Sequence, residues 1–142
     1  GAVYKVTSAK GKTPTVSYYA DPSKKSRQKK IVIPKQVTIQ GVTYKVTSIA
    51  ANACKGNKKI TSLIIGSNIK SIGKNAFYGC KNLKKLVINS KKLTAESIGK
   101  NAFQGISDKA VVQTPKELTK KYRKLLRKKG LPESAKVRKK GK

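Results

Sequence analysis

The titratable side chains limit the chemistry that this chain can perform. Its 142 residues include 35 Lys or Arg, five Asp or Glu and no His. Without His, imidazole-based nucleophile–base pairs and His metal sites are excluded. A paired-carboxylate mechanism needs two acids that converge on one cleft. The five acids are instead scattered: Asp21, Glu96, Asp108, Glu117 and Glu133. We therefore predict that the protein is not an enzyme and has no catalytic, cofactor-binding or metal-binding residues.

The excess of basic residues gives a formal net charge of +30 at pH 7. A low-GC genome favours Lys over Arg, but it favours Asp and Glu as well, so it does not explain why acids are scarce. A field of one sign attracts anionic partners and weakens as salt rises. Nucleic acid, anionic wall polymer, sulfated glycan and acidic lipid are all partners that fit this charge.

Two basic clusters are candidate contacts for a polyanion. They lie in a polar loop over 21–30 and in a C-terminal segment, and comprise Lys24, Lys25 and Arg27, and Lys120, Lys121, Arg123, Lys124, Arg127 and Lys128. Nucleic-acid binding favours aromatic side chains interleaved with Arg. Here Arg is scarce and Tyr122 lies on an apolar stripe. A solvated, salt-screened face is the first interpretation, attraction to an anionic polysaccharide or wall polymer the second, and specific nucleic-acid binding the third.

One seven-residue sequence motif, which we call the repeated phrase, occurs three times. It indicates the elements that position these side chains. It spans Ser48–Cys54 (SIAANAC), Ser71–Phe77 (SIGKNAF) and Ser97–Phe103 (SIGKNAF). The isoleucines of successive copies are 23 and 26 residues apart. A period in the twenties is typical of a solenoid, in which each unit buries its apolar edge by stacking on its neighbours.

Each repeat is predicted to contribute one short parallel strand. These strands are Ser62–Ile65, Lys85–Ile88 and Val111–Gln113, with Ile31–Ile33 as a first one. Alternation along a strand sends every second side chain inward, so the intervening residues form a candidate binding face: Val32, Ser62, Ile64, Lys85, Val87 and Val111. The valines and isoleucines of this face are expected to form an apolar stripe. The alternative is that β-branched residues suit any strand and that the N-terminal hairpins cover them.

The repeated phrase itself predicts a helical turn that faces the sheet. Phe77, Phe103 and Cys54 occupy equivalent positions, and three residues further on come Cys80, Ile106 and Asn57. An offset of three places both groups on one side of a turn. The recurring asparagines, Asn52, Asn75 and Asn101, are expected to bond free backbone groups there. Cys54 and Cys80 are expected to lie in successive repeats, one above the other. The two alternatives for them are a disulfide and a pair of buried free thiols.

The segments on either side of the repeats predict caps. The N-terminal part predicts two hairpins, Val3–Thr7 with Thr15–Tyr19 around Gly11-Lys12, and Val37–Ile39 with Val42–Val46 around Gln40-Gly41.

The C-terminal part predicts a capping box, in which Thr114 is the N-cap, Pro115 the first helical residue and Glu117 reaches back. The helix that follows has an apolar face formed by Leu118, Tyr122, Leu125 and Leu126, and it ends at Gly130, after which Leu131 folds back. This helix is expected to cover the last rung, and Arg138–Lys142 is expected to be a disordered tail.

The segment Ser71–Ile88 (SIGKNAFYGCKNLKKLVI) resembles the BspA-like leucine-rich repeat, whose units follow roughly IGxxAFxxCxxLxxIxIP. The resemblance extends over about 31–130, with three departures: Cys54 in place of Phe, Asn57 in place of Cys, and an insertion with Ile106 in place of Cys in the third unit. It implies a right-handed superhelix with parallel strands on one face, secretion or display at the cell surface, and adhesion to host or matrix components.

The sequence therefore predicts an α+β repeat protein with a hairpin cap over 1–46, leucine-rich repeats over 47–113, a capping helix and turn over 114–137 and a basic tail over 138–142. The expected function is a non-catalytic extracellular binding or adhesion module that presents a rigid sheet with Lys-rich edges to a protein, a glycan or an anionic polymer. The alternatives are a structural or wall-retention domain of a larger surface protein and a nucleic-acid-binding protein. No apolar run is long enough to span a membrane. The chain has no Met and no evident signal peptide, so it is expected to be a processed or trimmed piece.

Overall fold

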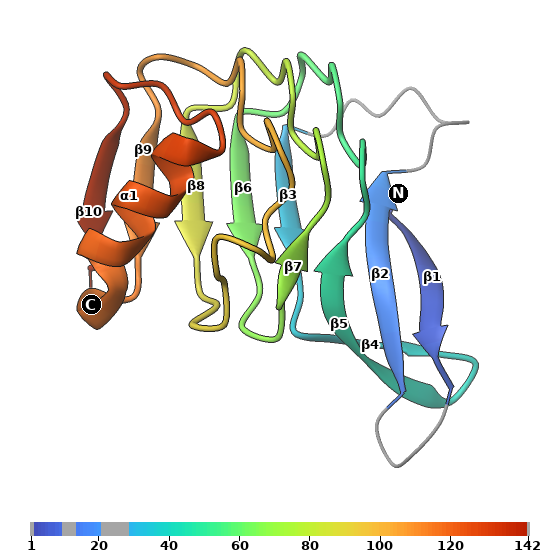
Figure 1. Cartoon of the computed structure of the whole chain (residues 1–142). Coiled ribbons are helices and arrows are strands. Elements are labelled where there is room, and N and C mark those ends of the chain that lie inside the picture. The colour runs from blue at the N-terminus through green and yellow to red at the C-terminus, as the bar shows by residue number, and fades with distance from the viewer. Residues whose placement is uncertain (1, 10–13, 21–28, 142) are drawn as a thin grey trace.

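The structure is a computed structural model that describes residues 2–9, 14–20 and 29–141. The described residues form ten strands, one 3-10 helix and one α-helix (Figure 1). In chain order these are β1 (Ala2–Ser8), β2 (Thr15–Ala20), β3 (Lys30–Ile33), β4 (Gln36–Ile39), β5 (Val42–Ile49), β6 (Ser62–Ile65), β7 (Ser71–Ile72), β8 (Lys85–Ile88), β9 (Val111–Thr114), η1 (Lys116–Leu118), α1 (Thr119–Lys128) and β10 (Lys136–Lys139).

A parallel sheet with one strand per repeat forms one side of the molecule. Its order is β10-β9-β8-β6-β3, and every neighbouring pair is parallel. Ile31, Leu63, Leu86 and Val112 are partners in register, and all four are buried. The predicted parallel strands, including the first at β3, are confirmed. The right-handed superhelical twist stays a prediction.

A second sheet contains both predicted hairpins. Its order is β1-β2-β5-β4, with β7 paired to β5. Strands β1 and β2 are antiparallel, as are β4 and β5, so both hairpins are confirmed. The turn between β4 and β5 places Gln40 and Gly41 at φ 50° and 80°, which a two-residue hairpin turn requires. The Gly11-Lys12 turn and most of the basic loop lie outside the described residues.

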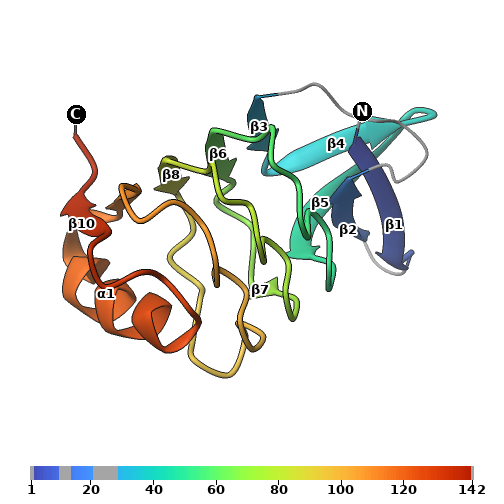
Figure 2. The ribbon, with the colours of Figure 1, turned by 90° about the horizontal axis from the view of Figure 1, so that it is seen from above.

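The core lies between the parallel sheet and the remaining elements. Figure 2 shows β5, β7, the repeated turns and α1 on one side of the parallel sheet, whose other side they leave uncovered. The rings of Phe77 and Phe103 stack within this core, with centroids 5.6 Å apart and planes 16° apart. Both side chains are fully buried. The predicted equivalence of these two positions in successive repeats is confirmed.

The repeated phrase forms stacked turns, and the predicted helical turn is wrong. The predicted burial on one side is correct, since Phe77 and Cys80 are both fully buried. A helix does not continue because Asn75 has φ 58°, in the left-handed region. Successive turns bond to one another instead, with the Phe77 amide donating to the Ala102 carbonyl at 2.8 Å. The Ser-Ile pair before each turn adds a second parallel ladder, Ile49–Ile72–Ile98, that was not predicted.

The repeated asparagines act through their backbone and not through their side chains. Asn52, Asn75 and Asn101 have φ of 60°, 58° and 60°. Among the described residues, the side-chain amide groups of these three asparagines form no hydrogen bond. The predicted bonds to free backbone groups are therefore wrong. Asn is chosen because it enters the left-handed region more readily than other residues that carry a Cβ.

The predicted capping box at the C-terminal helix is wrong. Thr114 is the last residue of β9, and its Oγ1 shares a hydrogen bond with Thr119 Oγ1 at 2.7 Å. Neither η1 nor α1 has a side-chain N-cap, and Glu117 pairs with Lys91 at 2.7 Å. The Thr114 hydroxyl does not cap the helix because it bonds Thr119 Oγ1 and the Arg138 carbonyl instead.

The predicted apolar face and end of the helix are confirmed. Tyr122, Leu125 and Leu126 are buried against the last repeat. Gly130 has φ 99°, and the buried Leu131 folds back so that its amide donates to the Leu126 carbonyl.

The prediction of a disordered basic tail over 138–142 is wrong for the first residues of that range. Residues Lys136–Lys139 form β10, which pairs in parallel with β9 and is the last strand of the sheet. Val137 is buried, whereas Lys136 and Arg138 are exposed. This alternation is the strand signal that the surrounding Lys and Arg residues hid in the sequence.

Candidate binding face on the parallel sheet

The open side of the parallel sheet carries two rows of outward-facing residues, which we call the sheet face. The first row is Lys30, Ser62, Lys85, Val111 and Lys136, and the second is Val32, Ile64, Val87, Gln113 and Arg138. All six residues predicted for the face lie in these rows, because their strand neighbours are buried. Val111 lies in the first row, beside Lys85, and not in line with Val87 as the predicted stripe required.

The apolar part of the sheet face is shorter than predicted. Val32 is 52% exposed and Ile64 is half-buried, so β3 and β6 present an apolar surface. Val87 is only 7% exposed although its place in the strand is an outward one. The continuous stripe is therefore wrong, and the apolar surface is concentrated at one end of the face.

The rest of the sheet face is basic. Lys30, Lys85, Lys136 and Arg138 are outward and exposed, and none of the ten positions in the two rows is an acid. Four positions of the two rows were not predicted as part of the face: Lys30, Gln113, Lys136 and Arg138. The signal that could have found Lys136 and Arg138 is the single valine between basic residues in KVRK, which has the period of a half-buried strand.

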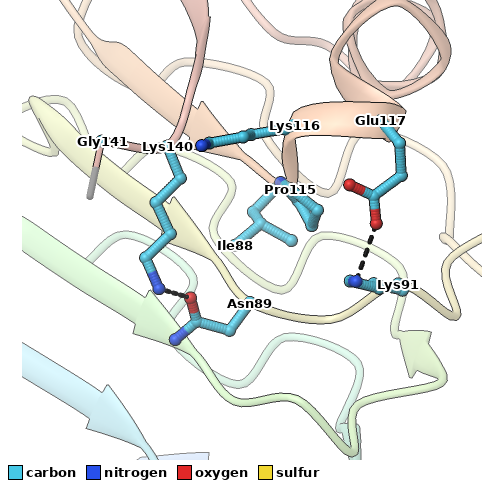
Figure 3. A pocket seen from close by; sticks show the side chains of 8 residues that line it. All are labelled: Ile88, Asn89, Lys91, Pro115, Lys116, Glu117, Lys140 and Gly141. Carbon is cyan, nitrogen blue, oxygen red and sulfur yellow. Dashed lines mark hydrogen bonds and ion pairs between the residues drawn. The ribbon is translucent and has the colours of Figure 1, made fainter.

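Two hollows lie beside the sheet face, along the ends of its strands. One has a volume of about 270 Å³ and includes Ile88, Pro115 and Lys116; the other has about 400 Å³ and includes Val32, Pro34 and Lys35. Asn89 and Lys140 line both hollows, and Lys140 Nζ donates a hydrogen bond to Asn89 Oδ1 between them (Figure 3).

One ion pair lines the smaller hollow, on the side away from Lys140 and Asn89 (Figure 3). Figure 3 shows Lys91 beside Glu117, with Nζ and Oε1 2.7 Å apart. The hydrogen bond from Lys91 holds the pKa of the exposed Glu117 carboxyl below its usual value. The charge of Lys91 is therefore balanced at neutral pH, whereas no ion pair among the described residues balances Lys116 or Lys140.

The basic clusters predicted as polyanion contacts divide into two groups. Lys120, Lys121, Lys124 and Lys128 are exposed on α1, which lies on the opposite side of the parallel sheet from the sheet face (Figure 2). Arg123 and Arg127 have structural partners. Lys24, Lys25 and Arg27 lie outside the described residues.

The two arginines of α1 hold the segment that leads to β10. Arg123 Nη2 donates to the Val137 carbonyl at 2.9 Å. Arg127 donates to the carbonyls of Pro132 and Ala135, and its Nε lies 3.8 Å from Glu133. A guanidinium can donate to several carbonyls at once, which a lysine ammonium on a flexible chain does less well.

The two cysteines are free and buried. Cys80 Sγ donates to the Cys54 carbonyl at 3.0 Å. Burial raises the pKa of Cys54 to about 12 and that of Cys80 to about 11, so both stay protonated at neutral pH. The thiols therefore serve as small core residues, the disulfide does not form in this structure, and neither sulfur is an activated nucleophile.

Within residues 2–9, 14–20 and 29–141, no group of three or more Cys, Asp and Glu side chains is placed to hold a metal ion. In the same residues, no helix has the length and apolar character needed to cross a membrane.

Two crystal structures resemble this fold. One is a leucine-rich cell surface protein from Faecalibacterium prausnitzii A2-165, with a TM-score of 0.52 and 26% identity over 82% of this chain and 32% of that one. The other is a leucine-rich repeat protein from Bacteroides ovatus ATCC 8483, with a TM-score of 0.50 and 23% identity over 82% of this chain and 36% of that one. The chain thus spans about a third of the length of each. A comparison with curated proteins found no match.

A family description also matches most of the chain. The BspA type leucine rich repeat region matches residues 24–133 in six copies. This range extends beyond the predicted repeats at 47–113 and takes in β3 and α1. The repeated turns, the parallel sheet and this match agree, and the chain belongs to the BspA-type leucine-rich repeat family.

Proposed function

We propose that this chain is a non-catalytic protein-binding module of the cell surface and that the sheet face is its contact surface. Membership of the family indicates a protein-binding or structural role. The cell-surface description of the similar protein from Faecalibacterium prausnitzii supports the location. The sheet face supports the choice of surface, because it is the side of the parallel sheet that the other elements leave uncovered (Figure 2).

One observation carries the proposal. The sheet face places an exposed apolar residue, Val32, and the half-buried Ile64 beside a series of cations, with no acid in either row. Protein interfaces commonly have an apolar centre and a polar margin, and charge complementarity selects the partner and speeds association. The complementary partner is a protein segment whose apolar residues are flanked by Asp or Glu.

Peptides selected from a random phage-displayed library provide the test. We expect the selected peptides to combine apolar and acidic residues. The double variant Lys85→Gln/Arg138→Gln should weaken their binding by about thirtyfold, since each of the two lost charge-assisted contacts contributes on the order of 1 kcal/mol.

The matched control is Lys74→Gln/Lys100→Gln, which removes the same charge from two exposed lysines of the repeated turns. We expect it to change the affinity by less than about twofold. Equal losses in both variants, together with loss of all binding in about 0.5 M salt, would show that only net charge acts. That result would favour wall retention over specific binding.

A further inference from the structure

A second basic site lies at the opposite ends of the same strands from the two hollows beside the sheet face. It is a surface hollow of about 450 Å³ at the start of β6 and its neighbours, which we call the lysine hollow. Its lining residues are Lys29, Lys58, Lys59, Thr61, Asn82 and Lys84. These residues precede β3, β6 and β8 in the chain, and Figure 1 shows the starts of these three strands at the upper edge of the parallel sheet. None of them belongs to the two rows of the sheet face.

We propose that the lysine hollow binds an extended polyanion through its sulfate or phosphate ester groups. This site goes beyond the proposed protein-binding function and does not depend on it. Four of the six lining residues are Lys, and none is an acid. The ion pairs among the described residues involve Lys91 and Arg127, so the four lysines of the hollow have no carboxylate partner there.

The backbone that carries these lysines is fixed by contacts between the repeats. The Thr61 amide donates to the Lys29 carbonyl at 2.7 Å, and the Lys84 amide donates to the Thr61 carbonyl at 3.0 Å. Asn82 Nδ2 donates to the Lys58 carbonyl at 2.6 Å and ties one loop to the next. The four cations are thus anchored on loops with little freedom to separate, and their mutual repulsion is relieved when an anion binds.

The spacing of the lysines favours a ligand with several anionic groups. Lys29 and Lys84 flank Thr61 in the strand order, which places their backbones about 10 Å apart, or two strand spacings. The four lysines around the hollow carry more charge than one small ion balances, whereas neighbouring esters along a polymer can balance all four. Lysine ammonium groups bind such esters as point charges.

The composition of the lysine hollow argues against recognition of nucleic-acid bases. It contains no Arg and no aromatic side chain, whereas base recognition on single strands depends on aromatic stacking. We therefore expect a DNA oligonucleotide to bind no more tightly than a phosphate chain of equal charge.

The test is a titration of the ¹⁵N-labelled full chain, monitored by amide chemical shifts. One arm uses a heparin hexasaccharide, which carries sulfate esters, and the other uses a glycerol phosphate oligomer, which carries phosphate esters; the tighter arm identifies the ester. In at least one arm, we expect the largest shifts at Thr61, Asn82 and Lys84. Largest shifts along the sheet face or α1 in both arms would overturn the proposal.

Variants give an independent measurement. Lys59→Gln/Lys84→Gln should weaken binding in the tighter arm by about tenfold, and Lys74→Gln/Lys100→Gln by less than about twofold. The four lysines substituted in these two variants are all exposed. Both variants should therefore fold, which their amide spectra will show. Equal weakening by the two variants would overturn the proposal. Because Lys85 and Arg138 lie outside the hollow, loss of peptide binding by Lys85→Gln/Arg138→Gln tests the sheet face separately.

Discussion

At the scale of single residues, the glycine of the repeated phrase is required by close packing of successive turns. A Cβ at Gly73 would collide with the backbone of Ala51, and a Cβ at Gly99 would collide with the backbone of Lys74. The first copy of the phrase has Ala50 at this position. Alanine fits there because the neighbour of Ala50 is β2, whose Tyr18 carbonyl accepts its amide, and not a preceding turn.

We predict that Gly99→Ala destabilises the protein by about 3 kcal/mol or more, because the colliding atoms belong to the backbone and cannot move aside. Urea unfolding of the two proteins measures the change. The control is the reverse substitution, Ala50→Gly, which should cost no more than about 1 kcal/mol. Similar effects of the two substitutions would contradict the stacking of turns described above.

The buried thiols predict a dependence of stability on alkaline pH. The pKa values of Cys54 and Cys80 rise from 9.0 to about 12 and about 11 on folding. Between these values the unfolded chain has released thiol protons that the folded chain retains, so stability falls as pH rises above 9.

The measurement compares wild type with Cys54→Ala/Cys80→Ala by urea unfolding at about pH 8 and about pH 10.5. The stability of the wild type relative to the variant should fall by about 2 kcal/mol for each thiol. The variant keeps every lysine of the wild type, so the contribution of the lysines cancels in the difference. A difference that does not change with pH would show that the thiols are not buried as described.

At the scale of elements, the last strand depends on the helix that precedes it. Arg127 of α1 donates to two carbonyls of the segment between α1 and β10, and Arg123 donates to one within β10. These bonds explain why two of the few arginines in a Lys-rich chain occur on this helix.

We predict that Arg127→Lys destabilises the protein by about 1 kcal/mol, because a single ammonium cannot replace the forked contacts. Hydrogen exchange of the amides in β10 should accelerate more than that of the amides in β6. The control is Arg138→Lys, a change at an exposed outward position, which should affect neither quantity. Unchanged exchange in β10 after Arg127→Lys would contradict this role of the arginine.

The parts of the fold that could be predicted are those with a local, repeated signal. The spacing of Leu63 and Ile65, repeated at Leu86 and Ile88, was sufficient to place two strands of the parallel sheet and to assign their inward sides. The stacked rings of Phe77 and Phe103 follow from the same repetition. Two hairpins followed from turn residues between alternating runs.

The parts that were mispredicted depend on contacts between distant segments. Thr114 has the local features of an N-cap, but its hydroxyl donates to the carbonyl of Arg138, which lies in the distant strand β10. Strand β10 has one buried valine among cations, and only the neighbouring β9 makes that pattern a strand. The alternation of residues along a strand predicts that Val87 points outward. It does not predict the low exposure of this side chain, which depends on neighbouring groups in the folded molecule.

At the scale of the whole molecule, the positive charge covers several surfaces with different environments. The sheet face, the lysine hollow and the outer side of α1 are all basic. Only the sheet face combines its cations with an exposed apolar residue in a strand of the parallel sheet. Binding that depends on charge alone should therefore involve all three surfaces, whereas specific protein binding should involve only the sheet face.

The most direct test of the sheet face as the binding surface is a footprint of lysine reactivity, measured by acylation and mass spectrometry with and without a saturating acidic peptide from the phage selection. We expect slower acylation of Lys30, Lys85 and Lys136 in the complex, with unchanged rates at Lys74, Lys100 and Lys120. Uniform slowing over all lysines, or slowing confined to α1, would contradict the assignment of the sheet face as the binding surface.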